Sequence, residues 1–106
     1  APEQVRLLPV TDEVQPYADQ LLEQLSQAGI RASVDRSGDR LGKLIRTGEQ
    51  MKIPVLAVIG AKEAEQNAVS LRSRRDGDLG VTAVKALLDA AQQANALRSA
   101  TLAMPA

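Results

Sequence analysis

This sequence of 106 residues contains no cysteine and no histidine. Their absence excludes disulfides, zinc sites built from Cys and His, and any nucleophile that a histidine would activate. A small domain without either residue is a poor candidate for an active centre. We therefore expect no catalytic residue and no metal site in this chain, and a binding role is favoured.

Aromatic residues are almost as scarce, since Tyr17 is the only one. Hydrophobic residues still make up 44% of the chain, which is enough to bury a core built from Leu, Val, Ile and Ala. A chain of this length fits one small domain. A nucleic-acid ligand would find almost no aromatic rings for base stacking and would have to stack on arginine planes.

The chain also lacks net charge, because 13 basic residues balance 13 acidic ones. A nonspecific, charge-driven nucleic-acid binder usually has a strong basic excess, so that class is disfavoured. A reader of a few specific bases remains compatible with this balance. No apolar run approaches the about 20 residues needed to span a bilayer, and no signal peptide is visible. We expect a soluble, cytoplasmic protein with no membrane partner.

The first half of the chain alternates strand and helix patterns. Strands are predicted at 5–10, 30–34 and 55–59, the last a continuous apolar run typical of a central strand. Helices are predicted at 13–28 and 39–51 from apolar residues at helical spacing. Such a β-α-β-α-β series predicts parallel strands joined by right-handed crossovers, and hence an α/β fold.

The pattern changes in the second half. Residues 69–72 alternate between apolar and polar and predict a strand with one solvated face, and 79–81 could form a last short strand. Thr82 is expected to cap a final helix. The sequence predicts a single domain over 1–95, followed by a flexible C-terminal tail over 96–106.

Two glycines, Gly38 and Gly42, flank the entry to the second predicted helix, where anions can bind. The segment RSGDRLGK lacks both the Walker spacing and GxGxxG, and Asp39 would repel a phosphate. A tight turn that needs glycine is the better interpretation of this segment alone.

Basic residues gather around the same helix in an otherwise neutral chain. A solvated helix face is the simplest explanation, and the same holds for two arginines that share one face of a later strand. The basic residues in question are Arg36, Arg40, Lys43 and Arg46 near the helix, and Arg72 and Arg74 on the strand.

The carboxyl ends of the predicted parallel strands carry polar residues. Asp35 and Arg36 follow one strand, and the segment from Gly60 to Glu63 follows the central strand. Ligands of open α/β sheets gather at such ends, so we expect the four basic residues near the second helix and Glu63 to share one edge. Glu63 and Glu65 resemble ordinary surface residues more than a catalytic carboxylate pair.

Five segments carry a resemblance to a known family. LLPVTDE, QAGIRASVDRSGDRLGKLIR, MKIPVLAVIGAKEAE, AVSLRSR and GDLG occur in this order. Together they resemble the C-terminal anticodon-binding domain of class II aminoacyl-tRNA synthetases, most closely the threonyl members. The match runs from Val5 to about Ala94. Several of the elements recur in the prolyl, histidyl and glycyl relatives, whereas the VTD start and the SLRSR-to-DLG end favour the threonyl family.

The resemblance implies a three-layer α/β/α domain with a five-stranded mixed sheet and about three helices. It implies that the chain recognises the threonine anticodon loop and so supports ATP-dependent attachment of threonine to its tRNA. Threonine anticodons share a central G and a final U. An arginine fork suits guanine acceptors, and a carboxylate can accept from guanine N–H groups. The residues implied to read bases are Arg46, Glu63 and Arg72, with Arg36, Arg40, Lys43 and Arg74 as supporting contacts.

One position departs from the family pattern. Bacterial threonyl enzymes commonly carry RNEK before the LG pair, with an Asn that contacts the anticodon, and Gly38 stands there in this chain. The contact would have to come from backbone, from Ser37 or from Arg40, or be absent. The assignment of residues to bases is therefore open.

The resemblance also implies properties of a parent enzyme. That enzyme would be a homodimer that uses ATP, Mg²⁺ and zinc in a catalytic module outside this chain. Three alternatives stay open: a prolyl or histidyl synthetase domain, a structural or dimerisation module of a synthetase-like accessory protein, and a flavodoxin-like small-ligand domain.

Overall fold

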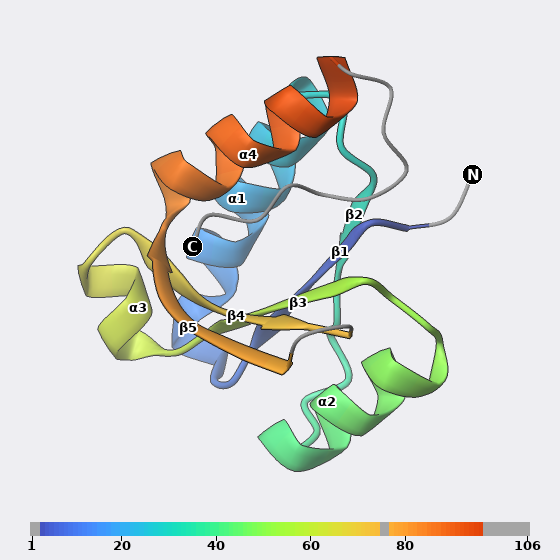
Figure 1. Cartoon of the computed structure of the whole chain (residues 1–106). Helices are drawn as coiled ribbons and strands as arrows, with labels where there is room; N and C mark the ends of the chain where they lie inside the picture. Colours follow the sequence, from blue (N-terminus) through green and yellow to red (C-terminus); the bar gives the residue numbers. More distant parts are fainter. Residues whose placement is uncertain (1–2, 75–76, 97–106) are drawn as a thin grey trace.

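The computed structural model describes residues 3–74 and 77–96, and one five-stranded sheet organises all of them (Figure 1). Three of the described helices are long, and the described residues also form one short helix and one 3-10 turn. The elements in chain order are β1 (Val5–Pro9), η1 (Asp12–Val14), α1 (Gln15–Gln27), β2 (Ala32–Val34), α2 (Leu41–Gln50), β3 (Val55–Ile59), α3 (Ala61–Glu65), β4 (Ala68–Ser73), β5 (Gly77–Ala83) and α4 (Val84–Ala96).

The strands lie in the order β2-β1-β3-β4-β5, so the apolar β3 is central. β1 runs parallel to β2 and to β3 because a helix connects each successive pair. β4 runs antiparallel to β3 and to β5. The predicted mixed, five-stranded sheet is confirmed.

Helices cover the two faces of the sheet unequally (Figure 1). α1 and α4 pack on one face over the larger core, which includes Leu7, Leu21, Ala57 and Leu87. α2 packs on the other face over a small second cluster. This arrangement confirms the three-layer α/β/α prediction. The second cluster consists of Leu8, Leu44, Ile53 and Leu56.

α2 covers only the β1 and β3 half of its face. Within residues 3–74 and 77–96, no helix covers β4 and β5 on this side. Ser70 lies opposite Val81 in the β4–β5 ladder, and the Val81 side chain is 60% exposed. We call this uncovered part of the sheet, with Ser70, Arg72 and Val81 on it, the open face.

Gly48 brings α2 close to the sheet. A Cβ atom at Gly48 would lie 2.5 Å from Cδ2 of Leu56, which is itself only 2% exposed. A side chain here would push the helix off β3. Glycine in mid-helix costs up to about 1 kcal/mol in helix propensity, and the close approach explains its presence.

Several details differ from the sequence predictions. Thr82 lies inside β5, which has seven residues, and α4 begins at Val84. Two of the apolar residues of the helix predicted at 39–51, Leu41 and Met51, are 40% and 55% exposed rather than buried. The predicted tail over 96–106 lies outside the described residues, except that Ala96 is the last residue of α4.

Candidate nucleic-acid interface

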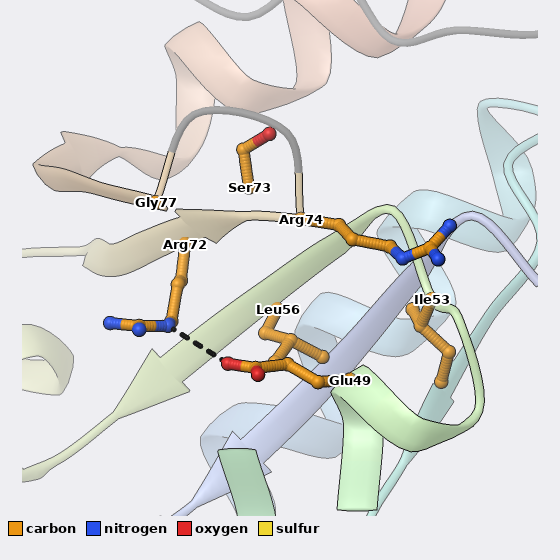
Figure 2. A pocket seen from close by; sticks show the side chains of 7 residues that line it. All are labelled: Glu49, Ile53, Leu56, Arg72, Ser73, Arg74 and Gly77. Carbon is orange, nitrogen blue, oxygen red and sulfur yellow. Dashed lines mark ion pairs between the residues drawn. The ribbon is translucent and has the colours of Figure 1, made fainter. Parts of the chain in front are cut away.

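Arg72 stands at the boundary between α2 and the open face (Figure 2). It lies opposite Leu56 in the β3–β4 ladder, so its side chain emerges on the side of the sheet that carries α2. The Nε atom of Arg72 lies 3.4 Å from Oε1 of Glu49, which α2 supplies. Both side chains are partly exposed, at 40% and 50%. The pair is therefore accessible to a ligand.

A cavity of about 330 Å³ opens beside this ion pair. Its volume lies at the lower end of the about 300–1,000 Å³ range of small-molecule sites. Its walls come from the last turn of α2, the start of β3 and the β4–β5 hairpin. The lining residues are Glu49, Ile53, Leu56, Arg72, Ser73, Arg74 and Gly77.

The alternation of β4 explains why Arg72 is available. Val69 and Leu71 are buried in the larger core, so Ser70 and Arg72 point to the opposite face. Arg74 is exposed, and its backbone N–H donates to the carbonyl oxygen of Pro54 at 2.9 Å, which extends the pairing of the two strands. In Figure 2 the side chains of Arg72 and Arg74 extend in opposite directions along the cavity.

Glu63 lies at the other end of β3. Its Oε1 accepts a hydrogen bond from the Gly60 N–H at 2.7 Å and so caps the first turn of α3. Leu56, the partner of Arg72, precedes Gly60 by four residues, which is about 13 Å along a strand. The structure therefore does not place Glu63 in the cavity beside Arg72.

Glu63 also affects the pKa of the Tyr17 side chain. Burial raises the pKa of the Tyr17 hydroxyl, and the negative charge of Glu63 raises that pKa further. The hydroxyl donates to the carbonyl oxygen of Ala68 at 2.9 Å. This aromatic ring belongs to the core side that α1 covers, so the open face has no ring for base stacking.

The basic residues of α2 are spread around the helix. Arg46 is exposed and lies about 200° around the helix from the buried Leu44, so it points away from the sheet. Lys43 lies 3.7 Å from Asp39 in an ion pair between side chains one turn apart. Arg40 is exposed at the N-cap position of α2. These cations face solvent rather than a common pocket.

Arg36 is held by α1 instead. Its guanidinium donates to Oδ1 of Asp19 and, at 3.1 Å, to Oε1 of Gln15. Arg36 and Glu63 both follow the carboxyl ends of parallel strands, as expected. Arg72 and Arg74, which were not part of the basic group expected at that edge, lie at the opposite end, where β3 begins.

Glu49 is the site residue that sequence analysis missed. Its only sequence signal is a position three residues after Arg46, which is ordinary for a solvated helix face. The pairing with Arg72 depends on the β3–β4 register and on the close approach of α2 at Gly48. Neither of these can be read from local spacing.

The described residues also bear on two other possibilities, a metal site and a membrane-spanning helix. Among them, no group of three or more His, Cys, Asp or Glu side chains could hold a metal ion. None of the helices in residues 3–74 and 77–96 is long and apolar enough to cross a membrane.

Comparison with known proteins gives the family. Residues 4–94 match the family described as "Anticodon binding domain". The chain is 86% identical over 102 residues to a threonine–tRNA ligase of Synechococcus sp. (strain CC9605), and 54% identical over 92 residues to that of Synechocystis sp. (strain ATCC 27184 / PCC 6803 / Kazusa). These matches cover 96% and 87% of this chain but only 17% and 15% of the relatives.

Two solved structures have the same fold. The RNA-binding domain of threonyl-tRNA synthetase from Cryptosporidium parvum superposes with a TM-score of 0.81 at 24% identity, covering 88% of this chain and 24% of that one. Histidyl-tRNA synthetase from Nostoc sp. PCC 7120 gives 0.79 at 28% identity, covering 84% of this chain and 21% of that one. With its sheet, its open face and these matches, the chain belongs to the anticodon binding domain family.

Proposed function

We propose that this chain recognises the anticodon loop of threonine tRNA as one part of a threonine–tRNA ligase. The observation that carries the proposal is the 86% identity to a threonine–tRNA ligase over 96% of the chain. The chain spans about 17% of that relative. Attachment of threonine would therefore be performed by the rest of the parent protein.

The open face supports the proposal physically. It offers aliphatic surface at Val81 on the side of the sheet from which the Arg72 side chain emerges. Single-stranded bases that are splayed from a loop can stack on arginine planes and hydrogen-bond at their edges. An anticodon loop presents bases in this form, and the cavity beside Arg72 provides space for them.

We assign base reading to Arg46, Glu63 and Arg72. Arg72 is suited to guanine acceptors because a guanidinium can donate two parallel hydrogen bonds. Glu63 uses Oε1 for its helix cap, so Oε2 would accept from the base. The supporting contacts to the loop backbone would come from Arg36, Arg40, Lys43 and Arg74, which are all exposed.

We extend the proposal to the parent protein. It would use ATP and Mg²⁺ for catalysis and a zinc ion to select threonine, all outside this chain. It would act in the cytoplasm, as a homodimer. This chain would contribute tRNA binding to that enzyme.

Titration with anticodon stem-loops tests the proposed function. A stem-loop with the anticodon GGU is compared with versions altered at the central G or at the final U, at physiological salt. We expect either base change to weaken binding by about 1–3 kcal/mol. Equal binding of all versions would show that the interaction is a charge contact that does not depend on base sequence. No binding at all would favour a structural module.

A further inference from the structure

The ion pair between α2 and β4 engages one particular nitrogen of Arg72. Glu49 Oε1 lies 3.4 Å from Nε, the nitrogen nearest the aliphatic stem. Figure 2 shows the two terminal nitrogens of Arg72 pointing away from Glu49. The edge of the guanidinium that can donate two parallel hydrogen bonds therefore stays accessible.

Recognition of a base by arginine requires the guanidinium plane to be fixed. A long side chain that is 40% exposed samples many rotamers, and each rotamer turns the donor fork in another direction. A carboxylate at Nε restricts this rotation while it leaves the terminal donors unused. The contact thus orders Arg72 before a ligand arrives, which lowers the entropic cost of binding.

The backbone around Glu49 is itself well placed for this role. Gly48 contacts Leu56 in the core, and Leu56 is the ladder partner of Arg72. Glu49 follows Gly48 directly, so the close approach of helix and strand sets the separation of the two charged side chains. The position of Glu49 is thus determined by buried packing, although its side chain is half exposed.

We propose that Glu49 is a positioning residue for base recognition, holding the Arg72 guanidinium through Nε so that the terminal nitrogens face the incoming base. This inference rests on the proposed function. Glu49 would not contact the base. Its own negative charge would weaken binding to every RNA slightly, and its benefit would be seen only in discrimination between bases.

The chain provides a matched control for that charge effect. Asp78 is the ladder partner of Arg72 on β5, so it brings a second carboxylate to the same part of the sheet. Its Oδ1 accepts from the Gly80 N–H at 2.8 Å, a local contact that an asparagine could keep. Asp78→Asn therefore removes one negative charge near Arg72 without removing the contact at Nε.

The experiment measures discrimination as the ratio of the dissociation constants for the GAU and GGU stem-loops. Glu49→Ala, which removes the acceptor of the Nε contact together with its charge, is expected to reduce this ratio by about two- to fivefold, the range of an exposed ion pair. Asp78→Asn should leave the ratio at the wild-type value while it binds all loops somewhat more tightly. In an Arg72→Ala background, Glu49→Ala should have no further effect on the ratio.

Other results would overturn the inference. An undiminished ratio in Glu49→Ala would show that the contact does not orient Arg72. An equal loss in Asp78→Asn would assign the effect to charge alone, and a further loss in the Arg72→Ala background would assign it to a route other than Arg72. A wild-type chain that does not discriminate would instead overturn the proposed function itself.

Discussion

At the scale of single residues, Arg72 combines a backbone that is paired on both sides with an exposed side chain. It lies in a central ladder between β3 and β5, yet its side chain is 40% exposed. Its backbone is therefore held in place while its guanidinium remains available. The binding proposal depends most strongly on this residue.

Replacing Arg72 with alanine should weaken binding of the GGU stem-loop by about 1–3 kcal/mol, because a bidentate contact to guanine is lost. The free energy of unfolding should change by no more than about 0.5 kcal/mol, since the exposed pair with Glu49 adds little stability. Fluorescence titration and urea unfolding measure the two quantities. Lys85→Ala, on the helix of the opposite face, is the control and should bind as the wild type does. A folding defect in Arg72→Ala with unchanged affinity would contradict the assignment.

Tyr17 makes stability depend on alkaline pH. Its pKa is raised above 10.0 in the folded state, so the folded chain holds the phenolic proton to higher pH than the unfolded chain. The resulting contribution to stability is complete below pH 10.0 and is lost as pH rises from there through the folded-state pKa. Urea unfolding at a series of pH values should show this decline.

Tyr17→Phe provides the comparison for that titration. It should cost about 0.5–1.5 kcal/mol at neutral pH because the hydrogen bond to the Ala68 carbonyl is lost. The variant should also lose part of the decline in stability above pH 10.0. An identical decline in the wild type and the variant would assign the alkaline sensitivity to other groups.

At the scale of elements, local patterns predicted most of the framework. Gly29 directly follows the helix predicted at 13–28, at the position where glycine commonly ends a helix. The structure shows it at φ 81°, with the Ile30 N–H donating to the Leu25 carbonyl just beyond the helix. The apolar run of β3 occupies the centre of the sheet, as predicted. These features depend on neighbours in sequence, which explains why spacing was sufficient.

The features that were missed depend on distant neighbours or on short segments. α3 has five residues, fewer than two helical turns, so it shows no periodicity. β5 is longer than its apolar core suggests, because pairing with β4 extends it through Gly77 and Thr82. The separation of Glu63 from Arg72 follows from the antiparallel return of β4.

The contact between α2 and the sheet can be tested through Gly48→Ala. The new methyl group would meet Leu56 at 2.5 Å, and we expect a net loss of about 1–3 kcal/mol despite the better helix propensity of alanine. Leu56→Ala alone should cost about 2–5 kcal/mol through loss of packing. The double variant should lose less unfolding free energy than the sum of the losses in the two single variants. The reason is that Leu56→Ala removes the side chain with which the new methyl group clashes. Strict additivity in urea unfolding would argue against this contact.

At the scale of the whole molecule, the balance of charges limits how the chain can attract RNA. Its 13 basic and 13 acidic residues give no overall field, so affinity must come from a few local contacts.

Lys43→Ala should weaken the binding of all stem-loops by the same factor. A plot of the logarithm of the association constant against the logarithm of the salt concentration has a negative slope. The variant should make this slope less steep by about 0.7, the value for one phosphate contact with single-stranded RNA. Binding isotherms at several salt concentrations measure this slope. A selective loss for the GGU loop would make Lys43 a base reader instead.

The small cluster beneath α2 also has a dynamic consequence. Leu8, Leu44, Ile53 and Leu56 are the buried residues of that cluster, whereas α1 rests on the much larger core of the opposite face. Local opening is easiest where few apolar contacts must break, so the amide hydrogens of α2 should exchange with solvent sooner than those of α1. An RNA loop that bridges Arg46 on α2 and Arg72 on β4 would close this opening. The helix that presents half of the binding surface would then be the segment whose hydrogen exchange slows most when RNA binds.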